Sequence, residues 1–141
     1  MKARTWGSIA VLAVLSFGAA PAAAQLAPAL KYAWSLNLEA YNHKDVDGTM
    51  RTVDSRSPDY APTKQAIEEQ FKDLDVTATL VDFDYMGHDK EFAVARVKTK
   101  TTGKPGSGFA DNVTDAIVLF HQENGTWKVW SEQILGVDIL P

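Results

Sequence analysis

Two side chains near the carboxyl end of the chain could take part in proton transfer. Asp115 precedes the apolar run 116–120, and His121 ends it. A carboxylate at the start of an apolar strand loses hydration, which would raise its pKa towards the range that a general base needs. His121 could shuttle a proton near neutral pH. The alternatives are that Asp115 lies in water or pairs with Arg96 or Lys98, and that His121 is an ordinary cross-strand residue.

Aromatic and polar side chains elsewhere could line a pocket for a small molecule. Alternation along a predicted strand puts Ser131 and Gln133 on the same face as Trp127. Polar groups would then stand on an apolar wall. Such walls orient small ligands. The alternative is that the aromatic residues only fill a core. The complete set of predicted pocket residues is Trp34, Tyr41, Tyr60, Trp127, Ser131 and Gln133.

Neither a metal nor a cofactor is expected from the residue types. The three histidines are scattered, there is no cysteine, and no pair of histidines has the spacing of helical metal ligands. The chain has 18 acidic and 14 basic residues, for a net charge of −4. Nucleic acids and anionic membranes are therefore not expected as partners.

The amino terminus has the features of a secretory signal peptide. Lys2 and Arg4 precede an apolar run over 6–20, and an Ala-x-Ala site ends at Ala24. The apolar run is shorter than the roughly 20 residues that span a membrane. We therefore expect residues 1–24 to be cleaved, leaving residues 25–141 as one periplasmic or secreted domain without a membrane span.

Three helices are predicted before residue 75. Leu30, Trp34, Leu38 and Tyr41 recur at helical spacing, with Pro28 in a position suited to the helix entry. A short second helix should begin after Asp45, a good capping residue. A third helix should start around 62–63 and bury an apolar stripe over 66–74.

Four strands are predicted after residue 75, over 76–85, 91–101, 115–122 and 126–135. Asn124 and Gly125 tolerate positive φ and favour a tight hairpin between the last two. The apolar run 116–120 predicts a central strand with both faces covered. Strict alternation in the last strand places Trp130 and Ile134 on its outer face, where an uncovered apolar surface predicts a homodimer interface.

The order of elements predicts an α+β fold. Three amino-terminal helices should pack on a strongly curved antiparallel sheet of at least four strands, which forms a cone-shaped barrel with an open mouth.

The chain resembles the nuclear transport factor 2-like superfamily and, within it, the SnoaL-like proteins, which are polyketide cyclase-like. The similarity lies in three segments of the sequence: Glu39-Ala-Tyr-Asn-His-Lys-Asp-Val-Asp47, Pro62-Thr-Lys-Gln-Ala-Ile67, and Asn124-Gly-Thr-Trp-Lys-Val129. The resemblance implies a pocket between the first helix and the concave sheet, and frequent homodimers. SnoaL-like relatives often carry His-x-His after the tryptophan, whereas this chain has Ser131 and Gln133 there.

Three functional hypotheses follow. The first is a binding module that holds a small, partly apolar ligand in the cone. The second is an isomerase, cyclase or dehydratase that uses Asp115 or His121 as the base, in the manner of a ketosteroid isomerase. The third is a dimeric interaction module that works through Trp130 and Ile134.

Overall fold

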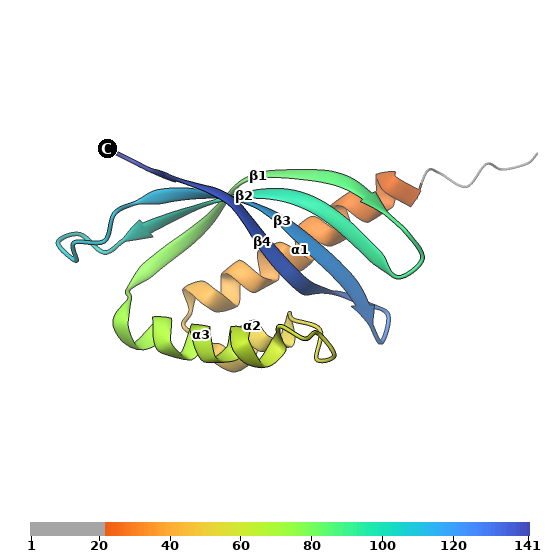
Figure 1. The fold of residues 1–141 in the computed structure, drawn as a ribbon, viewed down its shortest axis with the longest axis horizontal. Helices are drawn as coiled ribbons and strands as arrows, with labels where there is room; N and C mark the ends of the chain where they lie inside the picture. Colours follow the sequence, from red (N-terminus) through yellow and green to blue (C-terminus); the bar gives the residue numbers. More distant parts are fainter. Residues whose placement is uncertain (1–21) are drawn as a thin grey trace, which may run out of the picture.

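The computed structural model describes residues 22–141, and the predicted leader lies outside this range except for its last three residues. Three helices precede a single sheet of four antiparallel strands in the order β1-β2-β3-β4. The sheet curves over α1, while α2 and α3 lie beyond the far side of that helix (Figure 1). The predicted α+β cone is therefore confirmed. Within residues 22–141, no helix is both long enough and apolar enough to cross a membrane.

The long helix α1 (Ala22–Asn42) carries the predicted apolar stripe. Leu30, Trp34 and Leu38 are buried against the sheet. The helix starts six residues before Pro28, so the prediction that Pro28 marks its entry is wrong. The proline removes the helical partner of the Ala24 carbonyl, but that residue is exposed near the helix start, where water can replace the bond.

A local cap and a long-range bridge position α2 (Val46–Arg51) and the loop that leads to α3 (Tyr60–Asp73). Asp45 caps α2, because its Oδ1 accepts a hydrogen bond from the Gly48 amide at 2.8 Å. After α2, Val53 forms a parallel bridge to Val129 of β4, and the Asp54 amide donates to the Val129 carbonyl at 2.8 Å. The loop between the helices is therefore attached to the last strand.

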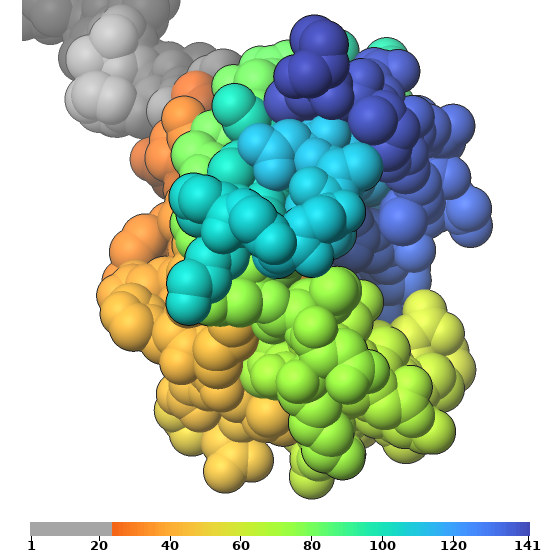
Figure 2. All heavy atoms as spheres, turned by 90° about the vertical axis from the view of Figure 1, so that its left-hand side faces the viewer, coloured from red at the N-terminus to blue at the C-terminus, as the bar shows by residue number. Residues whose placement is uncertain are grey.

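The sheet consists of β1 (Val76–His88), β2 (Phe92–Gly103), β3 (Asn112–Glu123) and β4 (Thr126–Ile139). Asn124 and Gly125 have φ of 52° and 78°, so the predicted hairpin with positive φ at both positions is confirmed. Figure 2 shows the helices below and the sheet with the loop joining β2 and β3 above. All strands run longer than predicted.

Register shifts interrupt both outer strand pairs and bend the sheet. Two lie on β1, and two lie on β4 opposite the steps Leu119/Phe120 and Asp115/Ala116 of β3. Each inserts an unpaired residue and increases local twist and curvature. The first shift on β4 leaves Trp130 without a partner, because Phe120 pairs with Val129 and Leu119 pairs with Ser131.

One core joins the concave face of the sheet to the helices. The prediction that β3 is covered on both faces is wrong, because Ile117 and Leu119 on its outer face are only half-buried. The apolar run instead marks one covered face and one face that no described element covers. The buried core consists of Leu30, Ala33, Trp34, Leu38, Met50, Val53, Ile67, Ala78, Ala93, Ala95, Val97, Val118, Phe120 and Val129.

Candidate functional site

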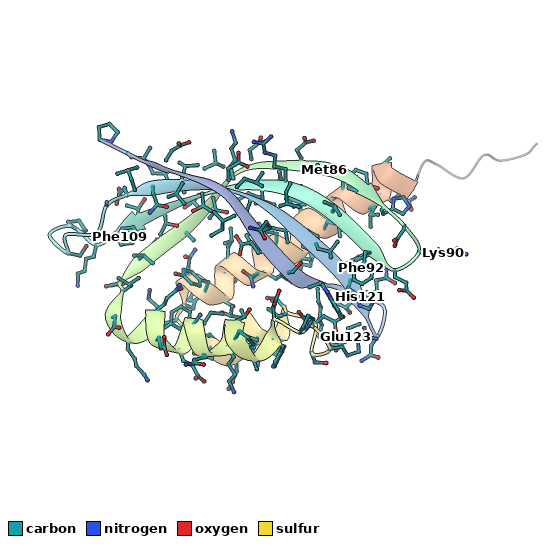
Figure 3. The ribbon with its side chains drawn as sticks, viewed as in Figure 1. Met86, Lys90, Phe92, Phe109, His121 and Glu123 are labelled. Carbon is teal, nitrogen blue, oxygen red and sulfur yellow. The ribbon has the colours of Figure 1, made fainter. Side chains whose placement is uncertain are left out.

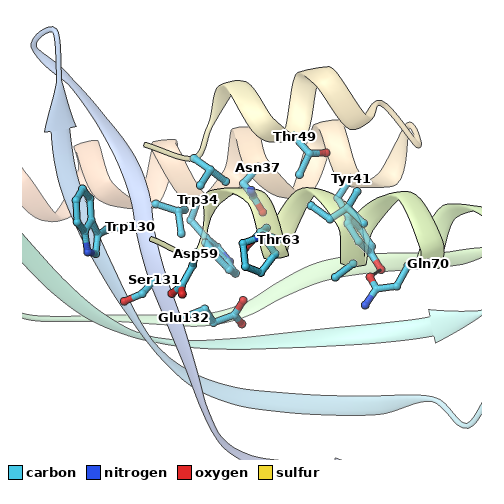
Figure 4. Close-up of a pocket in the computed structure, with 15 residues that line it drawn as sticks. Trp34, Asn37, Tyr41, Thr49, Asp59, Thr63, Gln70, Trp130, Ser131 and Glu132 are labelled. Carbon is cyan, nitrogen blue, oxygen red and sulfur yellow. Dashed lines mark hydrogen bonds between the residues drawn. The ribbon is translucent and has the colours of Figure 1, made fainter. Parts of the chain in front are cut away.

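A cavity of about 500 Å³ opens between α1, α3 and β4 (Figure 4). This volume is in the range of small-molecule sites. A smaller pocket of about 230 Å³ shares Trp34, Tyr41 and Glu132 with it and continues along the concave face of the sheet. The cavity is lined by Trp34, Asn37, Tyr41, Thr49, Val53, Asp59, Pro62, Thr63, Ala66, Ile67, Gln70, Val129, Trp130, Ser131 and Glu132.

Trp34 contributes a buried hydrogen-bond donor that has no acceptor. The residue is only 5% exposed, and its indole Nε1 has no hydrogen-bond partner within the described chain. Nearly all buried polar groups in proteins are paired, because an unpaired one loses its hydration without compensation. Since Trp34 also lines the cavity, this unsatisfied donor belongs to the cavity wall.

Glu132 brings a carboxylate to the same space from β4. Its side of the strand is set by the shift at Trp130, because Glu132 pairs with Val118, which is buried on the concave face. Solvent reaches the carboxylate through the open cavity, but the surrounding wall removes enough hydration to raise its pKa. Glu132 makes no ion pair with any described residue.

Tyr41 and Asp59 complete the polar lining at opposite ends. The Tyr41 hydroxyl donates to Gln70 Oε1 at 3.3 Å, and burial raises the pKa of this phenol. Asp59 occupies the capping position of α3, yet its side chain makes no capping hydrogen bond. Both groups can therefore still interact with a bound molecule.

The predicted pocket residues divide into two groups. Trp34, Tyr41 and Ser131 line the cavity. Tyr60 and Trp127 instead pack against the core, and Gln133 pairs with Ile117 on the exposed outer side of the sheet. Sequence reasoning missed several lining residues, of which Asn37 had a usable signal, since it falls between Trp34 and Tyr41 on one helical face. Missed lining residues with polar side chains are Asn37, Thr49, Asp59, Thr63, Gln70 and Glu132.

Strict alternation along β4 is wrong beyond Val129, for a physical reason. The unpaired Trp130 shifts the later residues by one position, so Glu132 and Ile134 face the concave side. Trp130 and Glu132 accordingly lie on opposite sides of β4 in Figure 4. The two residues predicted to share a dimer surface, Trp130 and Ile134, therefore do not share a face.

Asp115 lies on the outer face of the sheet and does not line the cavity. Its Oδ1 accepts a hydrogen bond from Arg96 Nε at 2.8 Å, and its Oδ2 accepts one from Arg96 Nη2 at 2.5 Å. These bonds lower the pKa of Asp115 below its ordinary value. The structure thus shows the salt-bridged alternative, in which the carboxylate is held ionised and away from the cone.

His121 belongs to a separate polar cluster at the β3–β4 hairpin. Its Nδ1 lies 2.7 Å from Oδ2 of Asp54, a residue with no exposed surface. Arg56 donates to both oxygens of Asp54, at 3.1 Å from Nε and 3.0 Å from Nη2. Burial alone would raise the pKa of Asp54, but the hydrogen bonds from Arg56 and His121 outweigh it and lower the pKa far below its usual range.

Aromatic rings close this cluster from the outside. The rings of His121, Phe92 and Trp130 form a triangle, in which the His121 centroid lies 4.6 Å from that of Phe92 and 4.9 Å from that of Trp130. Figure 3 shows Phe92, His121 and Glu123 together at this end of the sheet. Glu123 accepts hydrogen bonds from the Ser55 amide at 3.1 Å and from Lys128 Nζ at 2.8 Å. The cluster joins the α2–α3 loop to the hairpin.

Solved structures share this fold at low sequence identity. The chain is similar to a variant of Rv3472 of Mycobacterium tuberculosis, a protein of unknown function, with 12% identity, a TM-score of 0.71, and coverage of 86% of this chain and 78% of that one. It is also similar to an NTF-2 like protein of unknown function from Shewanella oneidensis, with 11% identity, a TM-score of 0.60, and coverage of 76% of this chain and 96% of that one. A ketosteroid isomerase-like protein from Erwinia carotovora atroseptica has 13% identity and a TM-score of 0.58, with coverage of 78% of this chain and 96% of that one.

These structures confirm the fold that the sequence resemblance implied. No curated protein matches the chain. The family model that matches differs from the SnoaL-like family named by the sequence resemblance. The model described as "Anti-sigma-I factor RsgI9, C-terminal domain" matches residues 33–140, which include all of the sheet, α2, α3 and the carboxy-terminal part of α1. The chain therefore belongs to the family of the anti-sigma-I factor RsgI9 C-terminal domain.

Proposed function

We propose that this domain binds a small, partly apolar molecule in the cavity between α1, α3 and β4. The observation that carries the proposal is the indole Nε1 of Trp34, which is buried without a partner in the wall of a 500 Å³ cavity. An acceptor on a bound molecule would remove the cost of leaving that donor unpaired. The apolar wall would supply most of the contact area.

The experiment is a thermal-shift screen with steroid-like, aromatic and polyketide-like compounds, followed by calorimetric titration of each hit. A ligand that binds the folded state raises the melting temperature in proportion to its affinity and concentration. Trp34→Phe keeps an aromatic ring but removes the donor, and should weaken binding of every true hit. Trp127→Phe is the matched control, because Trp127 packs against the core without lining the cavity. A screen without hits would count heavily against the proposal.

A further consideration favours binding over catalysis. The family description names an anti-sigma factor, which is a regulator, and a regulator requires recognition but not turnover.

The basic and apolar amino terminus supports a secreted or periplasmic domain. Amino-terminal sequencing of protein recovered from the periplasm or medium would test cleavage after Ala24.

Proton transfer is a second candidate, and one observation favours it. Glu132 places a carboxylate with a raised pKa in the wall of a cavity that also carries apolar side chains, and a partly desolvated carboxylate can act as a general base. A bound ketone should then exchange its α-hydrogen with deuterated solvent, measured by NMR, and Glu132→Gln should abolish that exchange. Exchange that survives in Glu132→Gln but is lost in His121→Gln would assign the role to His121, one of the two bases predicted from the sequence.

A homodimer through the outer face of the sheet is the third candidate. The ring of Trp130 meets that of Phe92 edge-on at 5.4 Å, and the half-buried Ile117 and Leu119 continue the apolar surface. No described element covers this face, and such surfaces often mediate self-association. Light scattering should give a dimer for the wild type and a monomer for Trp130→Ala. A monomeric wild type would end this proposal.

A further inference from the structure

The charges around the cavity are all of one sign. Two of the lining residues, Asp59 and Glu132, are acidic, and none is lysine, arginine or histidine. Lys44 approaches Tyr41, with its Nζ 5.8 Å from the ring centroid, but it does not line the cavity. Its ammonium instead donates to the carbonyls of Leu74 and Val76, each at 3.2 Å. A bound anion would therefore find two carboxylates and no compensating cation.

The two carboxylates are not committed to partners within the fold. Asp59 forms no capping hydrogen bond, and Glu132 forms no ion pair with any residue of the described range. Acidic residues that serve architecture are normally paired, as Asp54 is with Arg56 and His121 in this same domain. Unpaired acids at a cavity attract positive charge, and the net charge of −4 adds to that field.

The unpartnered indole is an independent indication that the cavity is built for a ligand. In Figure 4, Trp34 from α1 and Glu132 from β4 reach into the space between the helices and the strand. The indole Nε1 requires an acceptor, whereas the carboxylate requires a donor or a cation. The face of an indole also attracts cations. A ligand that satisfies both walls therefore needs a hydrogen-bond acceptor for Trp34 on α1 and a donor or cation for Glu132 on β4.

Resting on the proposed binding function, we infer that the cavity selects organic cations: an amine or ammonium ion on a partly apolar body that also carries one hydrogen-bond acceptor. Glu132 and Asp59 face the cationic group, while Trp34 Nε1 donates to the acceptor. Carboxylates and phosphates of the same size are rejected, because no lining residue can neutralise them.

Three probes of nearly equal size separate charge from shape. Phenylalaninamide carries an ammonium group, an amide oxygen and a phenyl ring. 3-Phenylpropanamide is the same molecule without the ammonium group, and 3-phenylpropanoate replaces the amide by a carboxylate. Calorimetric titration of the full domain should give phenylalaninamide an affinity about 10-fold higher than 3-phenylpropanamide, as expected for one charge-assisted contact. The carboxylate should bind most weakly.

The variants assign the selectivity to a residue. Glu132→Gln should lower the affinity for phenylalaninamide about 10-fold and leave that for 3-phenylpropanamide unchanged. Trp34→Phe should weaken both amides alike, because both offer the same acceptor. Glu68→Gln removes one charge from the exposed face of α3, away from the cavity, and should change neither affinity.

The outcomes distinguish the inference from the function on which it rests. Equal affinity for all three probes, lost together in Trp34→Phe, would retain the binding cavity and overturn the selection for cations. So would an affinity for phenylalaninamide that is unaffected by Glu132→Gln. No binding of any probe at millimolar concentration, in a protein that also gives no hit in the thermal-shift screen, would overturn both proposals.

Discussion

Burial acts to raise the pKa of two carboxylates, Asp54 and Glu132, but the fold supplies hydrogen-bond donors only to Asp54. Asp54 has no exposed surface, and three side-chain donors from Arg56 and His121 bind its oxygens. Glu132 stands in the cavity wall without an ion pair in the described chain, and its pKa is raised where that of Asp54 is lowered. The difference shows that the cluster at the hairpin is complete by itself, whereas the cavity leaves the Trp34 indole donor and the Glu132 carboxylate without partners in the described chain.

The comparison separates architecture from function within one small domain. The Asp54 cluster attaches the α2–α3 loop to the β3–β4 hairpin and thereby holds one wall of the cavity in place. The polar groups of the cavity contribute less to folding, because they have few partners to lose. Substitutions should therefore act on stability at the first region and on ligand affinity at the second.

The largest effect is expected at Asp54. Asp54→Ala leaves Arg56 and His121 without their shared acceptor, and should lower the free energy of unfolding by about 3 kcal/mol in urea denaturation. Since the folded-state pKa of Asp54 is lowered, its contribution is complete above the ordinary aspartate pKa and is lost as pH falls through the folded-state value. The deficit of the variant should therefore shrink in acid. A deficit below about 1 kcal/mol at neutral pH would show that the cluster is not structural.

A smaller loss of stability is expected at Trp34, coupled to a clear loss of affinity. Trp34→Phe removes ring volume but no hydrogen bond, and should cost about 1–2 kcal/mol in the free energy of unfolding. The affinity of any cavity ligand with an acceptor should fall in calorimetric titration. Unchanged affinity in the variant would mean that the indole donor faces no ligand and that the contrast with Asp54 is false.

Glu132→Gln should stabilise the protein slightly. Its folded-state pKa is raised, so the folded state binds more protons than the unfolded chain between the ordinary glutamate pKa and the raised value. The free energy of unfolding therefore falls as pH rises through that window. The variant does not show this fall, because glutamine does not titrate. The gain near pH 8 should stay below about 1 kcal/mol, because solvent reaches the carboxylate, and it should vanish below pH 4. Thermal melts at both pH values measure it.

The smallest effect is expected at Asp115. Asp115→Asn breaks only a partly exposed pair with Arg96 on the outer face. The melting temperature should change less than in the three variants above, and the difference should fade at high salt. Ligand affinity and any α-hydrogen exchange should equal the wild type. Loss of exchange in Asp115→Asn would instead support the sequence-based prediction of a catalytic base.

Most of the fold was predictable because its determinants are local. The stripe Leu30, Trp34, Leu38 has helical period, Asp45 is a capping residue, and Asn124-Gly125 specifies its turn. Ala93, Ala95 and Val97 alternate along β2 with period two, and all three are buried. These signals depend on a few neighbouring residues, and no distant contact reverses them.

The site was less predictable because it depends on long-range pairing. Asp54 and His121 lie 67 positions apart, and their segments meet through long-range contacts such as the Val53–Val129 bridge. Asp115 stands at the start of an apolar run, but the pairing of β2 with β3 presents it to Arg96 on the outer face. The insertion at Trp130 carries no residue signal, so counting by two along β4 gave Gln133 in place of Glu132.

The unpaired Trp130 also has an evolutionary consequence. Gain or loss of a single codon beside the hairpin would turn the inner surface of β4 outwards, and could exchange the chemistry of the cavity without altering the rest of the sheet. At 11–13% identity, an alignment gap displaced by one position in this strand would transfer a functional role to the wrong neighbour. Residues should therefore be matched between these proteins by superposed strand partners, starting from Phe120 opposite Val129.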